Sequence, residues 1–257
     1  MVPAPGRDHR RARDFLARDL DALQAYAGAY EGPLKVQVCG PWTLAAGIEL
    51  HRGDKMLADP AAVHDIGQSL AEGLRAHLGD LRSRLPSADL VLQLDEPSLP
   101  AVLAARVSTA SGYGTFRSIS PQTADETLRV VLAGAGETAV IAHCCASDPP
   151  LSLLTDLGVA GESVDLSVLG TRYDDDLGVS VEAGRVLLLG VVPGVDEELP
   201  APAPGAIREM WGRLGFPLEQ LTETVVVTPR CGLAGASPSY ARAAMAHARA
   251  IAANLLD

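Results

Sequence analysis

AVIAHCCASD, residues 139–148, begins as a short apolar strand and ends in side chains that can bind a metal ion. Residues two apart on an extended strand point the same way, so the ring of His143 and the sulfur of Cys145 converge. A second apolar run, VVVTPRCGLAG at 225–235, ends in Cys231. In a closed barrel of parallel strands these ends can meet, and the three side chains then supply most of a zinc site. The two stretches therefore predict a parallel barrel with a metal site at its rim.

Short apolar runs alternate with amphipathic helical stretches along the chain. The strand candidates are Leu34–Cys39, Leu90–Asp95, Ala139–His143, Ser163–Leu166, Val186–Val191 and Thr224–Thr228. The clearest helix lies between the first two runs, where apolar residues recur every three or four positions from Val63 to Leu85. Strict alternation of strands and helices predicts a parallel sheet with helices outside it. A length of 257 residues is normal for one α/β barrel, so we predict a single domain, residues 1–257, of the TIM-type (β/α)8 barrel class.

Composition and charge exclude several classes of protein. The net charge of −11 argues against a nucleic-acid partner and against an anionic membrane surface. The apolar runs are all far shorter than the roughly 18 residues that span a membrane, and the N-terminus shows no apolar targeting segment, which together predict a cytoplasmic protein. Four cysteines in a chain of this size do not make a disulfide framework, so the thiols are free for metal binding or catalysis. The composition does not indicate an oligomeric state.

Residues capable of chemistry follow the predicted strands at their carboxyl ends. They are Cys39, Asp95, Glu96, His143, Cys145, Asp165 and Cys231. In α/β barrels this rim carries the active site. We expect Cys39 and Cys144 to be buried packing residues, and Trp42 to pack as well. Asp165 can bind a metal or cap a following helix, and Glu96 can serve the site or the polar network of the rim.

Six segments, taken in order, resemble the last six strands of the catalytic barrel of cobalamin-independent methionine synthase. They are VQVCGPWTL, LVLQLDEPSLP, AVIAHCCA, SVDLS, LLLGVVPG and VVVTPRCGLAG, and the resemblance covers residues 34–240. That family belongs with the uroporphyrinogen decarboxylase-like barrels. The resemblance implies a zinc ion held by His143, Cys145 and Cys231. It places Asp165 where the family has a fourth ligand, a glutamate that is one methylene longer.

The activity implied by the resemblance is transfer of a methyl group to a thiol such as homocysteine. The methyl donor would be of the folate type or another small molecule. Zinc would stabilise the thiolate of the substrate near neutral pH, which makes that sulfur a good nucleophile. Asp95, in the Asp-Glu-Pro motif, would hold the amino group of homocysteine and so orient it. The alternative for Asp95 is a hydrogen bond within the rim.

The chain also departs from the family pattern. The family barrel has two further strands before the one matching Leu34–Cys39, and they carry a serine and a glutamate that bind homocysteine. The 33 residues before Leu34 predict only a helix and its flanks. The segment GVVPGVDEE at 190–198 lacks the family's histidine, and HRGDKMLADP at 51–60 lacks a tryptophan that could stack on a folate ring.

We therefore expect a barrel without its first two strands, weakly active or inactive by itself, whose missing strands are encoded upstream of Met1 or supplied by another polypeptide. Two alternatives to a methionine synthase-like enzyme stay open. The first is a related alkyltransferase that uses a different thiol or donor. The second is a truncated or degenerate zinc-binding paralogue without catalysis.

Overall fold

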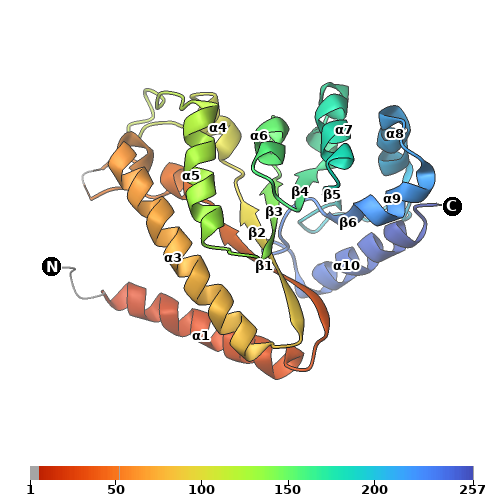
Figure 1. The fold of residues 1–257 in the computed structure, drawn as a ribbon, viewed down its shortest axis with the longest axis horizontal. Helices are drawn as coiled ribbons and strands as arrows, with labels where there is room; N and C mark the ends of the chain where they lie inside the picture. Colours follow the sequence, from red (N-terminus) through yellow and green to blue (C-terminus); the bar gives the residue numbers. More distant parts are fainter. Residues whose placement is uncertain (1–5, 52, 257) are drawn as a thin grey trace.

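The structure is a computed structural model that describes residues 6–51 and 53–256. Its centre is one parallel sheet in which spatial order follows chain order, β1-β2-β3-β4-β5-β6. The strands are β1 (Gly32–Cys39), β2 (Ala88–Asp95), β3 (Ala139–Cys144), β4 (Gly161–Asp165), β5 (Val186–Val192) and β6 (Val225–Pro229). The sheet curls, and the helices that follow the strands stand on its outer side (Figure 1).

The predicted (β/α)8 barrel is thus found in part, as a six-stranded half barrel. All six predicted strands are present, and β1, β2 and β4 each begin two residues earlier than predicted. Leu166 lies in a 3-10 turn rather than in β4, and Thr224 ends a helix rather than beginning β6. Among the described residues β1 and β6 are the two edges of the sheet and do not pair with each other.

The described residues also form ten α-helices and three 3-10 turns, which precede, connect or follow the strands. The helices are α1 (Arg7–Ala27), α2 (Pro41–Gly47), α3 (Pro60–Arg84), α4 (Leu99–Leu103), α5 (Pro121–Ala133), α6 (Leu151–Asp156), α7 (Asp174–Glu182), α8 (Gly205–Leu214), α9 (Leu218–Thr224) and α10 (Pro238–Ala253), and the turns are η1 (Met56–Ala58), η2 (Leu166–Val168) and η3 (Thr171–Tyr173). The two longest helices that follow a strand begin with a proline after a capping residue: Asp59 accepts from the Ala61 amide, and Ser237 accepts from the Tyr240 amide. Helices long and apolar enough to cross a membrane are absent from the described part of the chain.

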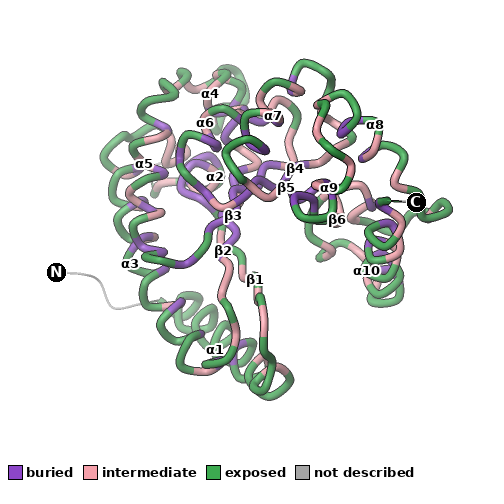
Figure 2. Tube along the Cα trace, turned by 45° about the vertical axis from the view of Figure 1, so that its right-hand side comes forward, coloured by how far each residue is buried: buried purple, intermediate pink, exposed green. Residues whose placement is uncertain are grey.

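The apolar residues beneath the helices form two clusters. The first lies under β1 to β3 and includes Leu78 of α3, Leu92 of β2 and Leu128 of α5. The second lies under β4 to β6 and includes Leu187 of β5 and Trp211 of α8. Figure 2 shows buried residues along β2 to β5 and on the inner sides of the helices, whereas α1 is almost entirely exposed. Burial of apolar side chains between the outer side of the sheet and the helices is therefore the main source of stability of the fold.

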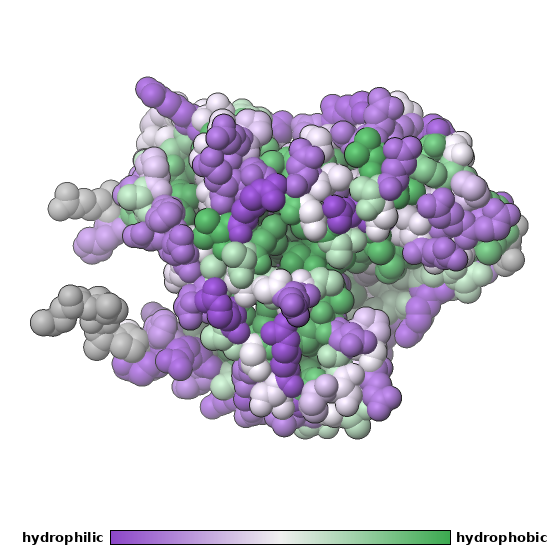
Figure 3. All heavy atoms as spheres, viewed as in Figure 1, coloured by the Kyte–Doolittle hydropathy of each residue, from purple (hydrophilic) through white to green (hydrophobic). Residues whose placement is uncertain are grey.

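The inner side of the sheet is less covered. Along β1 exposed and half-buried residues alternate strictly, and exposed Lys35, Gln37 and Cys39 face inward. The prediction that Cys39 is a buried packing residue is wrong, because it lies on the uncovered face of an edge strand. Cys144, which faces the helices, is fully buried as predicted. Figure 3 shows hydrophobic atoms reaching the surface in the middle of the visible face, with hydrophilic atoms mostly around them.

Candidate metal centre

Three side chains meet where β3 and β6 end. His143 lies in β3, Cys145 follows that strand, and Cys231 follows β6. In a flat sheet three strand spacings would separate β3 from β6 by about 14 Å. Because the sheet curls, the candidate ligand atoms of the three residues all lie within 4.8 Å of one another. This cluster, His143 with Cys145 and Cys231, is the predicted metal trio, and the structure brings its members together.

The spacing of the two sulfurs suits a zinc ion. The Sγ atoms of Cys145 and Cys231 are 3.7 Å apart. Two thiolates bound to one tetrahedral zinc, each at about 2.3 Å, lie about 3.8 Å apart. Two thiols and an imidazole are also the donor types that zinc prefers in proteins. The residues therefore fit the metal that the sequence predicted.

The ring of His143 is oriented by Ser163, which lies opposite it in the register of β3 and β4. Its Nδ1 lies 3.1 Å from the Ser163 carbonyl oxygen and 2.9 Å from the Ser163 Oγ. A carbonyl only accepts, so Nδ1 carries the proton and Nε2 keeps a lone pair for a metal. Burial lowers the pKa of His143, and this keeps the ring neutral, as metal binding requires.

The thiols of Cys144 and Cys145 are held in their protonated form. Burial, with the neighbouring Cys231 thiol adding to the effect, raises the pKa of Cys145 to about 12. Burial also raises the pKa of Cys144 to about 11. Cys144 points away from the trio and into the core, as predicted. A bound dication would reverse the preference at Cys145 because it stabilises the thiolate directly.

Asp165 is engaged elsewhere. Its Oδ1 accepts hydrogen bonds from the Ser167 amide at 2.8 Å and from the Ser167 hydroxyl at 2.6 Å, and so caps the turn η2. The Arg230 Nε lies 3.8 Å from the same oxygen. The structure does not bring Asp165 into the metal trio, so its role as a fourth ligand stays a prediction.

Asp95 shares a cleft with the metal trio. The cleft has a volume of about 480 Å³, and its wall includes Asp95, all three trio residues and Met245 of α10. The Asp95 Oδ1 accepts from the Gln93 Nε2 at 2.7 Å, and the Gln93 Oε1 accepts from the Lys35 Nζ at 2.6 Å. Sequence reasoning did not single out Lys35 or Gln93. The strand alternation could have found Gln93, because it precedes Asp95 by two residues and must share its face.

Glu96 serves the fold. Its buried carboxylate accepts from the amides of Trp42 and Thr43 and from the Thr43 hydroxyl, all at the N-terminus of α2. Burial raises the pKa of Glu96 to about 7, although these three hydrogen bonds act in the opposite direction. A Cβ at Gly40 would lie 2.3 Å from the Glu96 Oε1, so glycine is required there. Of the two roles open for Glu96, the structure supports membership of the polar network of the rim. Trp42 is buried and packs in the core, as predicted.

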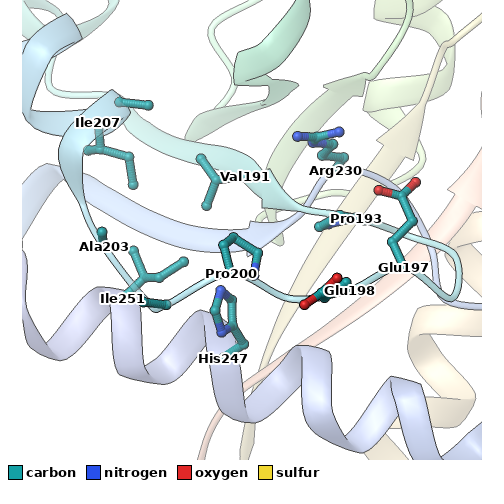
Figure 4. A pocket seen from close by; sticks show the side chains of 12 residues that line it. Val191, Pro193, Glu197, Glu198, Pro200, Ala203, Ile207, Arg230, His247 and Ile251 are labelled. Atoms are coloured by element: carbon teal, nitrogen blue, oxygen red, sulfur yellow. The ribbon is translucent and has the colours of Figure 1, made fainter.

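A second cavity of about 290 Å³ lies beside Arg230, between the loop after β5 and helix α10 (Figure 4). Glu197, Glu198 and His247 stand on its wall among apolar side chains. Among the described residues only the trio forms a group that could hold a metal ion. The trio lines the cleft and not this cavity.

Comparison with known proteins identifies one family. The family model for the catalytic domain of cobalamin-independent synthases matches residues 31–254. The match spans all six strands, the metal trio, Asp95 and Asp165. No curated protein matches the chain. The resemblance that six sequence segments indicated is thereby confirmed.

Proposed function

The chain belongs to the family of cobalamin-independent synthase catalytic domains, and from this we propose that it is a zinc-dependent enzyme that moves a methyl group to a thiol such as homocysteine. One observation carries the proposal. The metal trio and Asp95 line the same cleft, at the carboxyl ends of parallel strands, where barrel enzymes hold their substrates.

Each residue has a role in this proposal. The metal trio holds zinc. Asp165 gives up its hydrogen bonds to Ser167 and becomes the fourth zinc ligand. When bound, zinc keeps the substrate thiol as a nucleophilic thiolate near neutral pH. Ser163 holds the His143 ring in the tautomer that leaves Nε2 free. Asp95 accepts the ammonium group of the substrate and thereby directs its sulfur toward the trio.

Two further candidates are each favoured by an observation. A related alkyltransferase with another thiol or methyl donor is favoured by residues 51–60, which offer no tryptophan to stack on a folate ring. A zinc-binding paralogue without catalysis is favoured by the sheet, since the described residues form six strands whose edges β1 and β6 remain unpaired. All three candidates share the metal site. The two enzymes differ in the thiol or the methyl donor that they use, and the paralogue catalyses no transfer.

The test combines metal analysis with a panel of methyl donors. The purified chain is assayed for bound zinc and for methylation of homocysteine and of other small thiols by folate-type donors and by other small methyl donors. Methionine formed from a folate donor supports the methionine synthase-like function, and methionine from another donor supports the related alkyltransferase. One equivalent of zinc without methylation of any thiol supports the paralogue. A chain that binds no zinc overturns all three.

A further inference from the structure

A row of three polar side chains crosses the inner face of the sheet from β1 to β2. The Lys35 Nζ donates to the Gln93 Oε1 at 2.6 Å, and the Gln93 Nε2 donates to the Asp95 Oδ1 at 2.7 Å. The row runs toward the metal trio, because Asp95 lies opposite His143 in the register of β2 and β3. We call it the Lys35–Gln93–Asp95 row.

Lys35 and Asp95, at the two ends of the row, determine how the Gln93 amide between them is oriented. An ammonium group only donates, so the Gln93 amide must turn its oxygen to Lys35 and its NH2 to Asp95. The Asp95 carboxylate is then held at Oδ1, while Oδ2 receives no hydrogen bond from any described residue. Asp95 lines the cleft, so a carboxylate with one oxygen held and the other without a hydrogen bond presents an acceptor of fixed direction there.

Folding does not account for this row. The buried carboxylate of Glu96 receives three hydrogen bonds and that of Glu162 receives two, whereas Asp95 receives one. Lys35 stands on the exposed face of an edge strand, where a polar contact contributes little to stability. Gln93 itself is 9% exposed, so its amide is shielded from water and its orientation is maintained.

We infer that Gln93 and Lys35 are positioning residues, which fix the Asp95 carboxylate so that it accepts the ammonium group of an α-amino thiol. This inference rests on the proposed function, because the thiol of the same molecule must reach the metal trio. Lys35 acts through Gln93: its charge balances that of Asp95, and its hydrogen bond prevents the Gln93 amide from reversing.

The test measures thiol binding and does not depend on turnover. The cobalt-loaded chain is titrated with a thiol, and the sulfur-to-cobalt absorption band reports binding. Three thiols are compared: homocysteine, mercaptobutanoate, which lacks the ammonium group, and aminopropanethiol, which lacks the carboxylate. The variants are Gln93→Leu and Lys35→Met, with Lys35→Arg as the conservative replacement. Gln37→Leu is the matched control, since Gln37 lines the same cleft but lies outside the row.

We expect Gln93→Leu and Lys35→Met to weaken binding of homocysteine and of aminopropanethiol roughly tenfold, the effect typical of removing a partner that orients a ligand-binding group. Mercaptobutanoate should bind within about twofold of the unchanged chain, and Lys35→Arg should restore most of the loss. Because Lys35 is exposed, its variants keep the fold even if Gln93→Leu does not.

Three results would overturn the inference while leaving the proposed function intact. Equal weakening of all three thiols would show a structural role, and unchanged binding of homocysteine would show no role. Weakening limited to the two thiols that carry a carboxylate would show that Lys35 binds the substrate itself. If the unchanged, cobalt-loaded chain binds none of the thiols, the proposed function fails and this inference fails with it.

Discussion

The two faces of the sheet treat their polar residues differently. On the outer face Glu162 is fully buried and accepts from the Thr155 hydroxyl at 2.6 Å and from the Ser180 hydroxyl at 2.9 Å. These partners belong to α6 and α7, so the carboxylate links two helices to β4. On the inner face Asp95 and His143 line a cleft, and each keeps an acceptor atom that receives no hydrogen bond from a described residue.

We interpret this difference as a division between residues that serve folding and residues that are available to a ligand. A buried polar group whose hydrogen bonds are all made inside the protein has no capacity left for a substrate. A polar group with an unused acceptor beside a cleft does have that capacity. If this division holds, substitutions on the two faces should affect different properties of the protein.

The largest effect is expected at the metal trio. Cys145→Ser and Cys231→Ser each remove a thiolate ligand and should weaken zinc binding by more than about 100-fold. Cys144→Ser is the matched control, because its sulfur faces the core and not the trio. Metal analysis checks the result. Unchanged zinc content in both ligand variants would rule out the proposed site. Loss of zinc in Cys144→Ser alone would mean that Cys144, and not Cys145, is the ligand.

Asp95→Asn should weaken homocysteine binding by an amount on the order of 2–4 kcal/mol, because it removes an ion pair in a partly desolvated site. Asparagine keeps an oxygen that can accept from Gln93, so the fold and the bound metal should be retained. Thiol titration and metal analysis on the same sample check both parts. Release of the metal by this variant would place Asp95 among the ligands instead.

Two adjacent valines of β6 allow the packing of the two faces to be compared directly. Val225 is 6% exposed beneath the helices, whereas Val226 is 45% exposed on the inner face. Val225→Ala should lower the free energy of unfolding by about 2 kcal/mol, and Val226→Ala by less than about 0.5 kcal/mol. Denaturant unfolding of the two variants measures this. Equal losses would show that the inner face is packed as tightly as the outer one.

The smallest effect concerns pH. Burial raises the pKa of Glu162 above its ordinary value of 4.5, so between these two pKa values the folded chain holds a proton that the unfolded chain has released. Glu162 therefore makes stability fall as the pH rises above about 4.5. Glu162→Gln should flatten this part of the profile, since the hydroxyls of Thr155 and Ser180 can turn to accept from an amide. Denaturant unfolding across this pH range checks it, and an unchanged slope in the variant would assign the effect to another group.

The strands and the metal trio could be predicted because both follow from strong local patterns. Apolar runs mark the strands, and the two-residue period places His143 and Cys145 on one face. Details that depend on neighbours in space could not be predicted. Ser163 orients the His143 ring only because β4 pairs with β3 in this register. For Asp165 the sequence left both a metal ligand and a cap open, and in the structure its side chain caps the turn η2 through a local hydrogen bond to Ser167.

The exposure of Cys39 escaped prediction for a related reason. The sequence shows that a residue lies on a strand, but not whether another strand or helix covers that face. The Lys35–Gln93–Asp95 row likewise needs the pairing of β1 with β2, which brings Lys35 within reach of Gln93.

The division of the apolar residues into two clusters, one under β1 to β3 and one under β4 to β6, has a consequence for local unfolding. The boundary runs between β3 and β4, which pair over only the residues 141–144 and 161–164. Each side can act as a separate cooperative unit, and amides along this boundary should exchange with solvent together. His143 and Cys145 belong to the first unit, and Cys231 follows the last strand of the second. A metal bound by all three joins the units, so opening of the boundary and release of the metal become a single linked equilibrium.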